Sequence, residues 1–191
     1  MHASLCDFLS DIFQNAVESN AGSIRVNIEE NDTQISFLIE DNGKGMSEEV
    51  RTRVTDPFYT DGVKHAKRKV GLGIPFLIQA VEAVEGAFSL ESEVGQGTKV
   101  FFSFPLNHID CPPMGSMVST LLSLISFPGA YDLLVSRSLT VADKHDSYEV
   151  NRAELEELLG SFESVGALQL LRTYLQSQET ALNEIRNRIS H

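Results

Sequence analysis

The amino-acid sequence predicts an α+β fold, in which a mixed, mostly antiparallel sheet has helices on one face and a smaller C-terminal α/β extension follows. Two observations predict this class. Two stretches with the apolar spacing of helices, residues 4–19 and 73–86, are each followed by a pair of short, strand-like segments. Within each pair a short polar turn joins the two strands, which favours hairpins and therefore antiparallel neighbours.

The N-terminal part of the chain predicts one amphipathic helix followed by one hairpin. Apolar residues recur at three- and four-residue spacing across residues 4–19, which is typical of a helix with one buried face. Asn20 and Gly22 then end the helix. Residues 23–30 alternate polar and apolar side chains, and residues 34–41 form a second, more apolar strand after a polar turn.

A long polar segment, from residue 42 to about residue 69, separates this hairpin from the next helix. It contains one short helical stretch, residues 47–54, which begins after the capping residue Ser47. A connection of this length inside a compact domain is most often a lid or a binding loop. The elements predicted after it are a helix over residues 73–86 and strands over residues 87–93 and 98–106.

The character of the sequence changes after Leu106, so we divide the chain into an N-terminal domain, residues 1–106, and an extension of unknown role, residues 107–191. The last helix of the extension has apolar side chains at nearly heptad spacing. These side chains either pack against the chain's own core or form a homodimer contact. The elements expected in the extension are helices over residues 117–126, 152–162 and 165–189 and strands over residues 130–139 and 145–150.

Composition and charge exclude several classes of protein. The chain has 191 residues, of which 42% are hydrophobic, and no stretch approaches the roughly 18 apolar residues that span a bilayer. The N-terminus lacks the basic start of a signal peptide, and Cys6 and Cys111 give no disulfide framework, so we expect a cytoplasmic protein. A net charge of −12 disfavours nucleic acid and membrane lipid as partners.

Four short motifs carry the candidate chemistry. Asp11 and Asn15 lie four residues apart, on one face of the first helix. The second strand ends in EDNGKGM (residues 40–46), KVGLGIP (residues 69–75) leads into the next helix, and GQGT (residues 95–98) turns the last hairpin. Each motif alone is weak evidence, because glycine pairs are common and GLGIP matches neither of the usual phosphate-loop patterns.

In this order and at this spacing, the four motifs resemble the ATP-binding Bergerat fold of gyrase, Hsp90, histidine kinases and MutL, the GHKL superfamily. The resemblance covers about residues 5–106. It implies a stand-alone, histidine-kinase-like protein that binds Mg²⁺ and ATP, and then hydrolyses ATP or transfers its γ-phosphate to a partner protein. The alternative is a non-catalytic module whose interactions are gated by ATP.

The resemblance also assigns the adenine site. It implies that Asp41 accepts a hydrogen bond from the exocyclic amine of adenine, and a bond to a charged group contributes about 1.5–3 kcal/mol. Thr98 would support the same contact through its hydroxyl group and a water molecule. Gly43 and Gly45 would let the backbone approach the base, since glycine has no side chain to obstruct it. Met46 belongs to the same set of cofactor-binding residues.

The phosphate and metal contacts are implied in the same way. The helix after the second glycine pair presents its first amides to phosphate oxygens, which its dipole favours. Asn15 would supply one oxygen ligand to Mg²⁺, which takes its other ligands from phosphates and water. A basic residue would neutralise charge that develops on the γ-phosphate. The residues implied on the phosphate side are Lys69, Gly71, Leu72 and Gly73, with Lys64, Lys67 and Arg68 near them.

Asp11 is the candidate catalytic residue. In gyrase- and MutL-like ATPases the residue at this position is a glutamate that orients or deprotonates the attacking group, whereas histidine kinases often have asparagine there. A carboxylate at residue 11 therefore permits a role as general base or in positioning water. The alternative is an indirect role beside the magnesium ligand Asn15. Glu18, further along the same helix, is expected near the surface.

The histidines do not supply a phosphoacceptor. None of the five has the sequence context of the phosphorylated histidine of sensor kinases, so we expect the acceptor on a partner protein. A metal site at His108, Asp110 and Cys111 is disfavoured, because three ligands within four positions fit tetrahedral geometry poorly. A DNA-linked role like that of MutL is disfavoured by the acidic charge.

Overall fold

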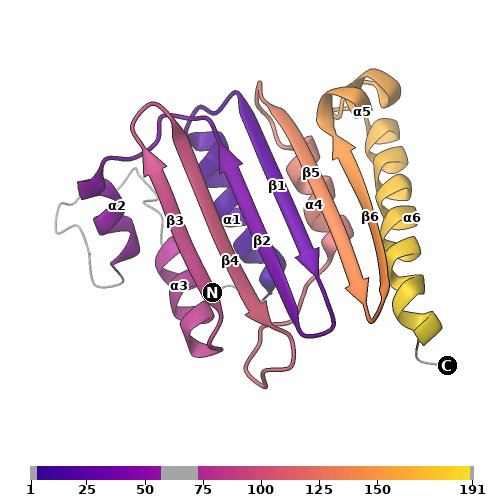
Figure 1. Cartoon of the computed structure of the whole chain (residues 1–191). Coiled ribbons are helices and arrows are strands. Elements are labelled where there is room, and N and C mark those ends of the chain that lie inside the picture. The colour runs from indigo at the N-terminus through magenta and orange to yellow at the C-terminus, as the bar shows by residue number, and fades with distance from the viewer. Residues whose placement is uncertain (1–3, 57–72, 190–191) are drawn as a thin grey trace.

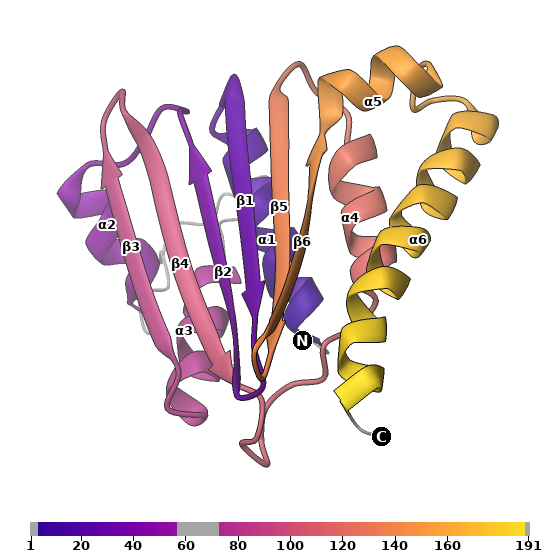
Figure 2. The ribbon, with the colours of Figure 1, turned by 45° about the vertical axis from the view of Figure 1, so that its right-hand side comes forward.

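The structure, a computed structural model, describes residues 4–56 and 73–189 of the chain. Six strands form one mixed sheet in the order β3-β4-β2-β1-β5-β6, and α1, α3, α4 and α6 lie on one side of it (Figures 1 and 2). The elements are α1 (Leu5–Glu18), β1 (Ser23–Glu30), β2 (Gln34–Asp41), α2 (Glu48–Thr55), α3 (Gly73–Ala83), β3 (Ala87–Glu93), β4 (Gly97–Pro105), α4 (Met117–Ser126), β5 (Asp132–Val141), β6 (Lys144–Asn151), α5 (Arg152–Leu159) and α6 (Val165–Ile189).

The predicted fold class is confirmed, and most predicted elements lie within a few residues of the observed ones. Two helices end earlier than expected, each for a local reason. Helix α3 ends at Ala83, where Glu85 takes a positive φ of 57° and the amide of Gly86 bonds back to Val81 at 2.8 Å. Helix α5 ends at Leu159, because Gly160 adopts a φ of 84° that a helix cannot continue through.

Helix α1 begins with a capping box and buries one face under the sheet. The Ser4 hydroxyl accepts from the Asp7 amide at 3.3 Å, and the Asp7 carboxylate accepts from the Ser4 amide at 2.9 Å. Its apolar side joins the core, while Asp11 and Asn15 remain only partly buried. The helix therefore fixes both side chains at the margin of the core. Its buried residues are Leu5, Cys6, Phe8, Leu9, Ile12, Phe13 and Ala16.

Residues 107–191 extend the same sheet and the same core. Strand β5 pairs in parallel with β1, from Ser23 opposite Asp132 to Glu30 opposite Leu139, and β6 pairs antiparallel with β5. The apolar seam of α6 faces inward, with Leu171 and Leu175 fully buried. These two leucines therefore pack within the chain rather than at its surface. Among the described residues, no helix is both long and apolar enough to cross a membrane.

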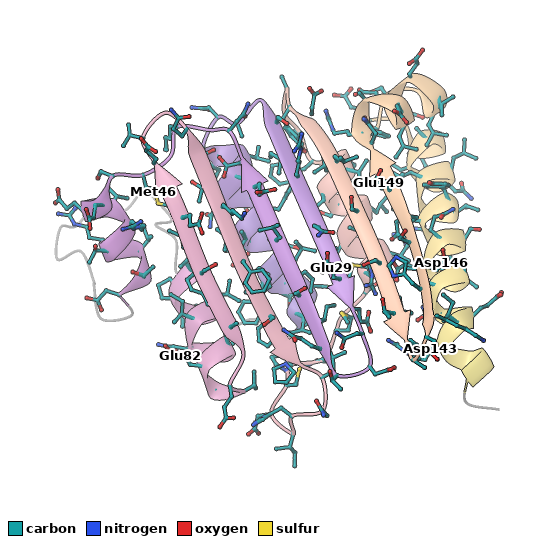
Figure 3. All side chains as sticks on the ribbon, viewed as in Figure 1. Glu29, Met46, Glu82, Asp143, Asp146 and Glu149 are labelled. Carbon is teal, nitrogen blue, oxygen red and sulfur yellow. The ribbon has the colours of Figure 1, made fainter. Side chains whose placement is uncertain are left out.

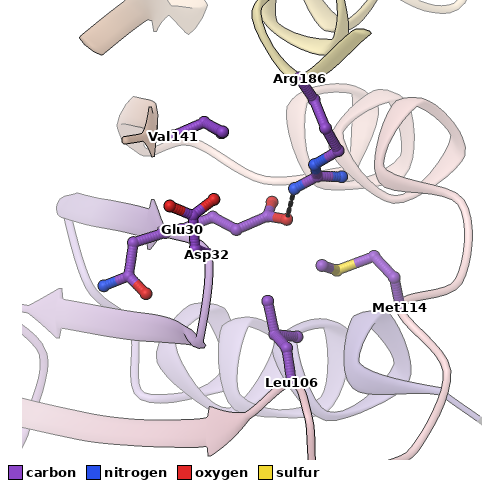
Figure 4. Close-up of a pocket in the computed structure, with 7 residues that line it drawn as sticks. Glu30, Asp32, Leu106, Met114, Val141 and Arg186 are labelled. Carbon is purple, nitrogen blue, oxygen red and sulfur yellow. Dashed lines mark hydrogen bonds and ion pairs between the residues drawn. The ribbon is translucent and has the colours of Figure 1, made fainter. Parts of the chain in front are cut away.

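A largely buried cluster of charged side chains, with Arg186 at its exposed margin, ties α6 to β1. The Arg137 guanidinium on β5 and the Arg186 guanidinium on α6 both donate to the Glu30 carboxylate, and Figure 4 shows the pair formed by Arg186. Glu179 on α6 accepts from the Tyr148 hydroxyl at 2.6 Å. Burial, and then the negative charge of Glu179, raise the pKa of Tyr148. The extension is thus attached to β1 by ion pairs as well as by the sheet.

The other face of the sheet is largely polar. It carries side chains such as Glu29 on β1 and Glu149 on β6, both exposed, on the side away from the helices (Figure 3). This arrangement follows from the alternation of each strand, in which every second residue points away from the helices.

Candidate functional site

Asp41 is the last residue of β2, on the side of the sheet that faces the helices. It lies opposite Ile24 of β1 and Thr98 of β4 in the sheet register. Its Oδ1 accepts from the Gly43 amide at 2.8 Å and from the Ser19 hydroxyl at 3.1 Å. Burial raises the pKa of the Asp41 carboxyl, although hydrogen bonds from Gly43, Ser19 and Thr98 oppose the shift. A carboxylate held in this way at a surface hollow is typical of a ligand site.

The turn after Asp41 packs closely against the end of α1. A Cβ atom at Gly43 would lie 1.7 Å from the Ser19 hydroxyl oxygen and 2.8 Å from the Ser19 carbonyl oxygen. The Lys44 amide donates to the same Ser19 carbonyl at 3.0 Å. At Gly45, where φ is 61°, a Cβ atom would lie 1.9 Å from the Glu93 carbonyl oxygen. Contacts within the protein therefore require glycine at both positions. This requirement is separate from the one that the resemblance implies, namely room for the base of a nucleotide.

Ser92 on β3 connects Met46, Gly97 and Thr98 by hydrogen bonds on the side of the site formed by β3 and β4. Its hydroxyl oxygen accepts from the Met46 amide at 2.9 Å, and it lies 2.9 Å from both the Gly97 carbonyl oxygen and the Thr98 hydroxyl oxygen. Met46 is held through its backbone, at the end of the sheet beside α2 (Figure 3). The sequence motifs did not indicate Ser92 or Ser19. The one signal for Ser92 was its place in the alternation of β3, on the same side as Phe88 and Leu90.

Asp41, Ser92 and Thr98 help to line a hollow at the ends of β2, β3 and β4. Its volume is about 440 Å³, within the range of about 300–1,000 Å³ that is usual for small-molecule sites. Asp41 and Thr98, which were predicted to bind the same ligand, both line this hollow, and Ser92 lines it with them. The lining residues are Glu40, Asp41, Arg51, Glu91, Ser92, Glu93, Gln96, Gly97, Thr98 and Lys99.

A second hollow, of about 500 Å³, lies at the opposite end of the sheet (Figure 4). Glu30 and Arg186 line it, and their ion pair occupies part of its wall. The Glu30 carboxylate is paired with guanidinium groups, and the Asp32 carboxylate accepts from the Ala142 amide at 2.9 Å. Because these carboxylates already have partners within the protein, the hollow at Asp41 is the better candidate for a ligand.

Asp11 and Asn15 lie on α1 next to the start of α3. A Cβ atom at Gly73, the first residue of α3, would lie 3.0 Å from Asp11 Oδ2, so Gly73 leaves room for this carboxylate. Asn15 is partly buried, and among the described residues its side-chain amide makes no hydrogen bond, which leaves its oxygen available to a cation. Glu18 is exposed and accepts from Gln14 at 2.7 Å, as expected.

Several predicted residues fall outside the part of the chain that the structure describes. They are Lys69, Gly71 and Leu72 of the second glycine motif and the basic residues Lys64, Lys67 and Arg68. Within the described residues, no group of three histidine, cysteine, aspartate or glutamate side chains is arranged to hold a metal ion. If Asn15 binds a metal ion, the other ligands would therefore come from a bound phosphate and water, which are common ligands of Mg²⁺.

The sheet, the position of Asp41 and the order of the motifs define an ATP-binding domain of the histidine-kinase type. The histidine kinase-, DNA gyrase B-, and HSP90-like ATPase family matches residues 2–108, and the chain belongs to this family. The resemblance predicted from the four motifs is thereby confirmed, and with it the presence of an ATP-binding domain.

Two curated relatives are kinases. The chain is 30% identical over 148 residues to the sensor histidine kinase AruS of Pseudomonas aeruginosa, a match that covers 72% of this chain and 15% of AruS. It is 29% identical over 97 residues to sporulation kinase A of Bacillus subtilis, covering 50% of this chain and 15% of that kinase. The chain thus corresponds to a small part of either relative.

The structural comparison agrees with the fold. The N-terminal domain of a DNA repair protein superposes with a TM-score of 0.53 and 14% identity, over 87% of this chain and 59% of that chain. At this identity the similarity shows the fold alone.

Proposed function

We propose that the chain binds Mg²⁺-ATP in the hollow at Asp41 and either hydrolyses it or transfers its γ-phosphate to a partner protein. The observation that carries the proposal is the Asp41 carboxylate. Two hydrogen bonds to Oδ1 hold it in place, burial raises its pKa, and it lines a hollow of about 440 Å³. These properties fit the recognition of an amino group that donates a hydrogen bond.

In this proposal, one set of residues contacts the adenine base and another set contacts the phosphates and Mg²⁺. Asp41 accepts from the adenine amine, and Thr98 lies beside it on the neighbouring strand. Asn15 supplies an oxygen to Mg²⁺, and the first amides of α3 face the phosphates. When bound, Mg²⁺ neutralises negative charge on the phosphate oxygens.

Asp11 is the proposed catalytic residue. It lies against Gly73 at the start of α3, the helix end that the resemblance assigns to phosphate. From this position its carboxylate orients or deprotonates the attacking water or hydroxyl group, as a general base does. Where the γ-phosphate is transferred rather than hydrolysed, the acceptor is a side chain of a partner protein. We also place the protein in the cytoplasm, because both Cys6 and Cys111 are free thiols.

The extension, residues 107–191, has a supporting role in this proposal. All the residues proposed to contact nucleotide lie before residue 107, and β5 joins the sheet beside β1. In this proposal the extension stabilises the sheet and provides a surface to which a partner protein binds.

The test follows the label of [γ-³²P]ATP after incubation with Mg²⁺ and the protein, with ATP binding measured in parallel. We expect label on free phosphate or on protein, and an Asp11→Asn variant that is about 100-fold slower or more, with ATP affinity changed only a few-fold. Glu18→Gln, an exposed acid on the same helix, is the matched control. If the wild-type chain binds ATP without moving the label, alone and with its partner, it is an ATP-gated module rather than an enzyme.

A further inference from the structure

The hydroxyl group of Ser92 uses all of its hydrogen-bonding capacity inside the protein. A serine hydroxyl has one proton to donate and two lone pairs that accept. Its oxygen accepts from the Met46 amide at 2.9 Å, which occupies one lone pair. It also lies 2.9 Å from the Gly97 carbonyl oxygen, which can only accept, so the Ser92 proton is directed there.

The direction of the third hydrogen bond follows from this count. The Thr98 hydroxyl oxygen lies 2.9 Å from the Ser92 hydroxyl oxygen, and either group could in principle be the donor. Because the Ser92 proton is already on the Gly97 carbonyl, Thr98 must donate and Ser92 must accept. The Thr98 hydroxyl therefore has no proton left for a ligand, and toward the hollow it can only accept.

Asp41 presents the same kind of group from the neighbouring strand. Asp41 and Thr98 are opposite each other in the sheet register, and both line the hollow. An ionised carboxylate only accepts hydrogen bonds. The wall of the hollow thus offers two acceptors side by side, and it favours a ligand whose facing edge carries hydrogen-bond donors. A carbonyl oxygen on that edge would face two acceptors without a proton between them.

We propose that Ser92 is a positioning residue that sets the base specificity of the site by holding the Thr98 hydroxyl as an acceptor. The site then selects a purine with an amino group at position 6, as in ATP, against one with a carbonyl oxygen there, as in ITP. This inference rests on the proposed function, since it concerns the same site. Ser92 acts through Thr98, without touching the base.

The experiment measures the dissociation constants of ATP and ITP, each with Mg²⁺, for the wild type and six variants. Ser92→Ala releases the Thr98 proton, which can then turn toward the hollow and donate to a carbonyl oxygen. We expect the preference for ATP over ITP to fall by about five- to tenfold, the effect of relieving one polar mismatch at a partly exposed site. Ser92→Thr keeps the hydroxyl group and should retain the preference. Ser89→Ala, on the exposed side of the same strand, is the matched control.

A double-variant cycle separates positioning from a general loss of structure. Thr98→Val replaces the hydroxyl with a methyl group of the same shape, so adding Ser92→Ala to it should leave the ATP-to-ITP preference unchanged. A further fall in that double variant, or an unchanged preference in Ser92→Ala alone, overturns the inference.

The proposed function has a separate readout in the same series. If Asp41→Asn leaves ATP affinity as it was, the adenine assignment fails and the inference about Ser92 fails with it. If Asp41→Asn weakens ATP binding while Ser92→Ala keeps the preference, the adenine site stands and only the role of Ser92 is refuted.

Discussion

Replacing Asp41 with asparagine should separate nucleotide binding from the stability of the free protein. Asparagine has nearly the same shape, and its Oδ1 can still accept from Gly43 and Ser19. The other side-chain atom changes from a charged acceptor to an NH₂ donor, which would face the donating amine of adenine. The loss of a hydrogen bond to a charged group, about 1.5–3 kcal/mol, lowers ATP affinity about 10- to 150-fold.

The same change should leave the free protein as stable as the wild type or more stable. Burial raises the pKa of Asp41 in the folded state, so between the unfolded and folded pKa values the native protein binds more protons. Stability from this group is therefore present at low pH and is lost as the pH rises through the folded pKa. At neutral pH the charged carboxylate destabilises the free protein, and asparagine removes that penalty.

Calorimetric titration with Mg²⁺ and a non-hydrolysable ATP analogue measures the affinity, and thermal unfolding from pH 4 to pH 8 measures the stability. The Tm difference in favour of Asp41→Asn should shrink as the pH falls. Asp132→Asn makes the same chemical change at an exposed position and should alter neither quantity. Unchanged ATP affinity, or a large fall in the Tm of the free Asp41→Asn variant, would refute the reasoning.

Two further predictions concern packing. In Gly43→Ala the new methyl group collides with the Ser19 carbonyl, so we expect a loss of about 1–3 kcal/mol of unfolding free energy and weaker ATP binding, measured by urea unfolding and titration. Gly166→Ala, in α6 with its nearest neighbour at 3.6 Å, should be neutral or stabilising, and equal losses for the two would contradict the prediction. Glu30→Gln leaves the buried Arg137 guanidinium with only the more distant Glu179 carboxylate, 3.5 Å away, and should lower the unfolding free energy by up to about 3–5 kcal/mol. Glu49→Gln breaks an exposed pair and should change it by less than about 0.5 kcal/mol, so similar losses from these two changes would refute a structural role for the buried cluster.

The secondary structure was predictable because its signals are local. The apolar spacing of α1 and the alternation of β1 and β2 involve only residues that are close together in the sequence, and the short turns favour hairpins. The position of Asp41 was predictable for the same reason, since a strand that ends in Asp-Asn-Gly places its last side chain at the end of the sheet, next to the turn.

The pairing of β5 with β1 had no such signal. A parallel neighbour is reached through a long crossover, here from Glu30 to Asp132, and no short turn in the sequence marks the contact. Arg137 shows the same limitation. It lies among apolar residues in the alternation of β5, and it is tolerated there because Glu30, 107 positions away, lies opposite its guanidinium. Pairs that are distant in sequence cannot be identified from one sequence without the fold.

The roles of Ser19 and Ser92 depended on the fold in a different way. Serine is common at helix ends and in strands, so neither residue is unusual in the sequence. Each becomes informative because of what lies opposite it, namely the Asp41 carboxylate for Ser19 and the Thr98 hydroxyl for Ser92. Small hydroxyl groups that complete a site are therefore found from contacts rather than from motifs.

The extension supports the site through the end of the sheet next to Asp41. The amide of Asp132, the first residue of β5, donates to the Gly22 carbonyl at 2.9 Å, and the Gly22 amide in turn donates to the Asn42 side chain at 2.9 Å. Asn42 directly follows Asp41, and its side chain also accepts from the Ser23 amide at 2.8 Å. A short chain of hydrogen bonds thus runs from the extension to Asn42, the residue next to Asp41. Since β5 also pairs along the whole of β1, a partner that displaced the extension would loosen the turn that holds Asp41.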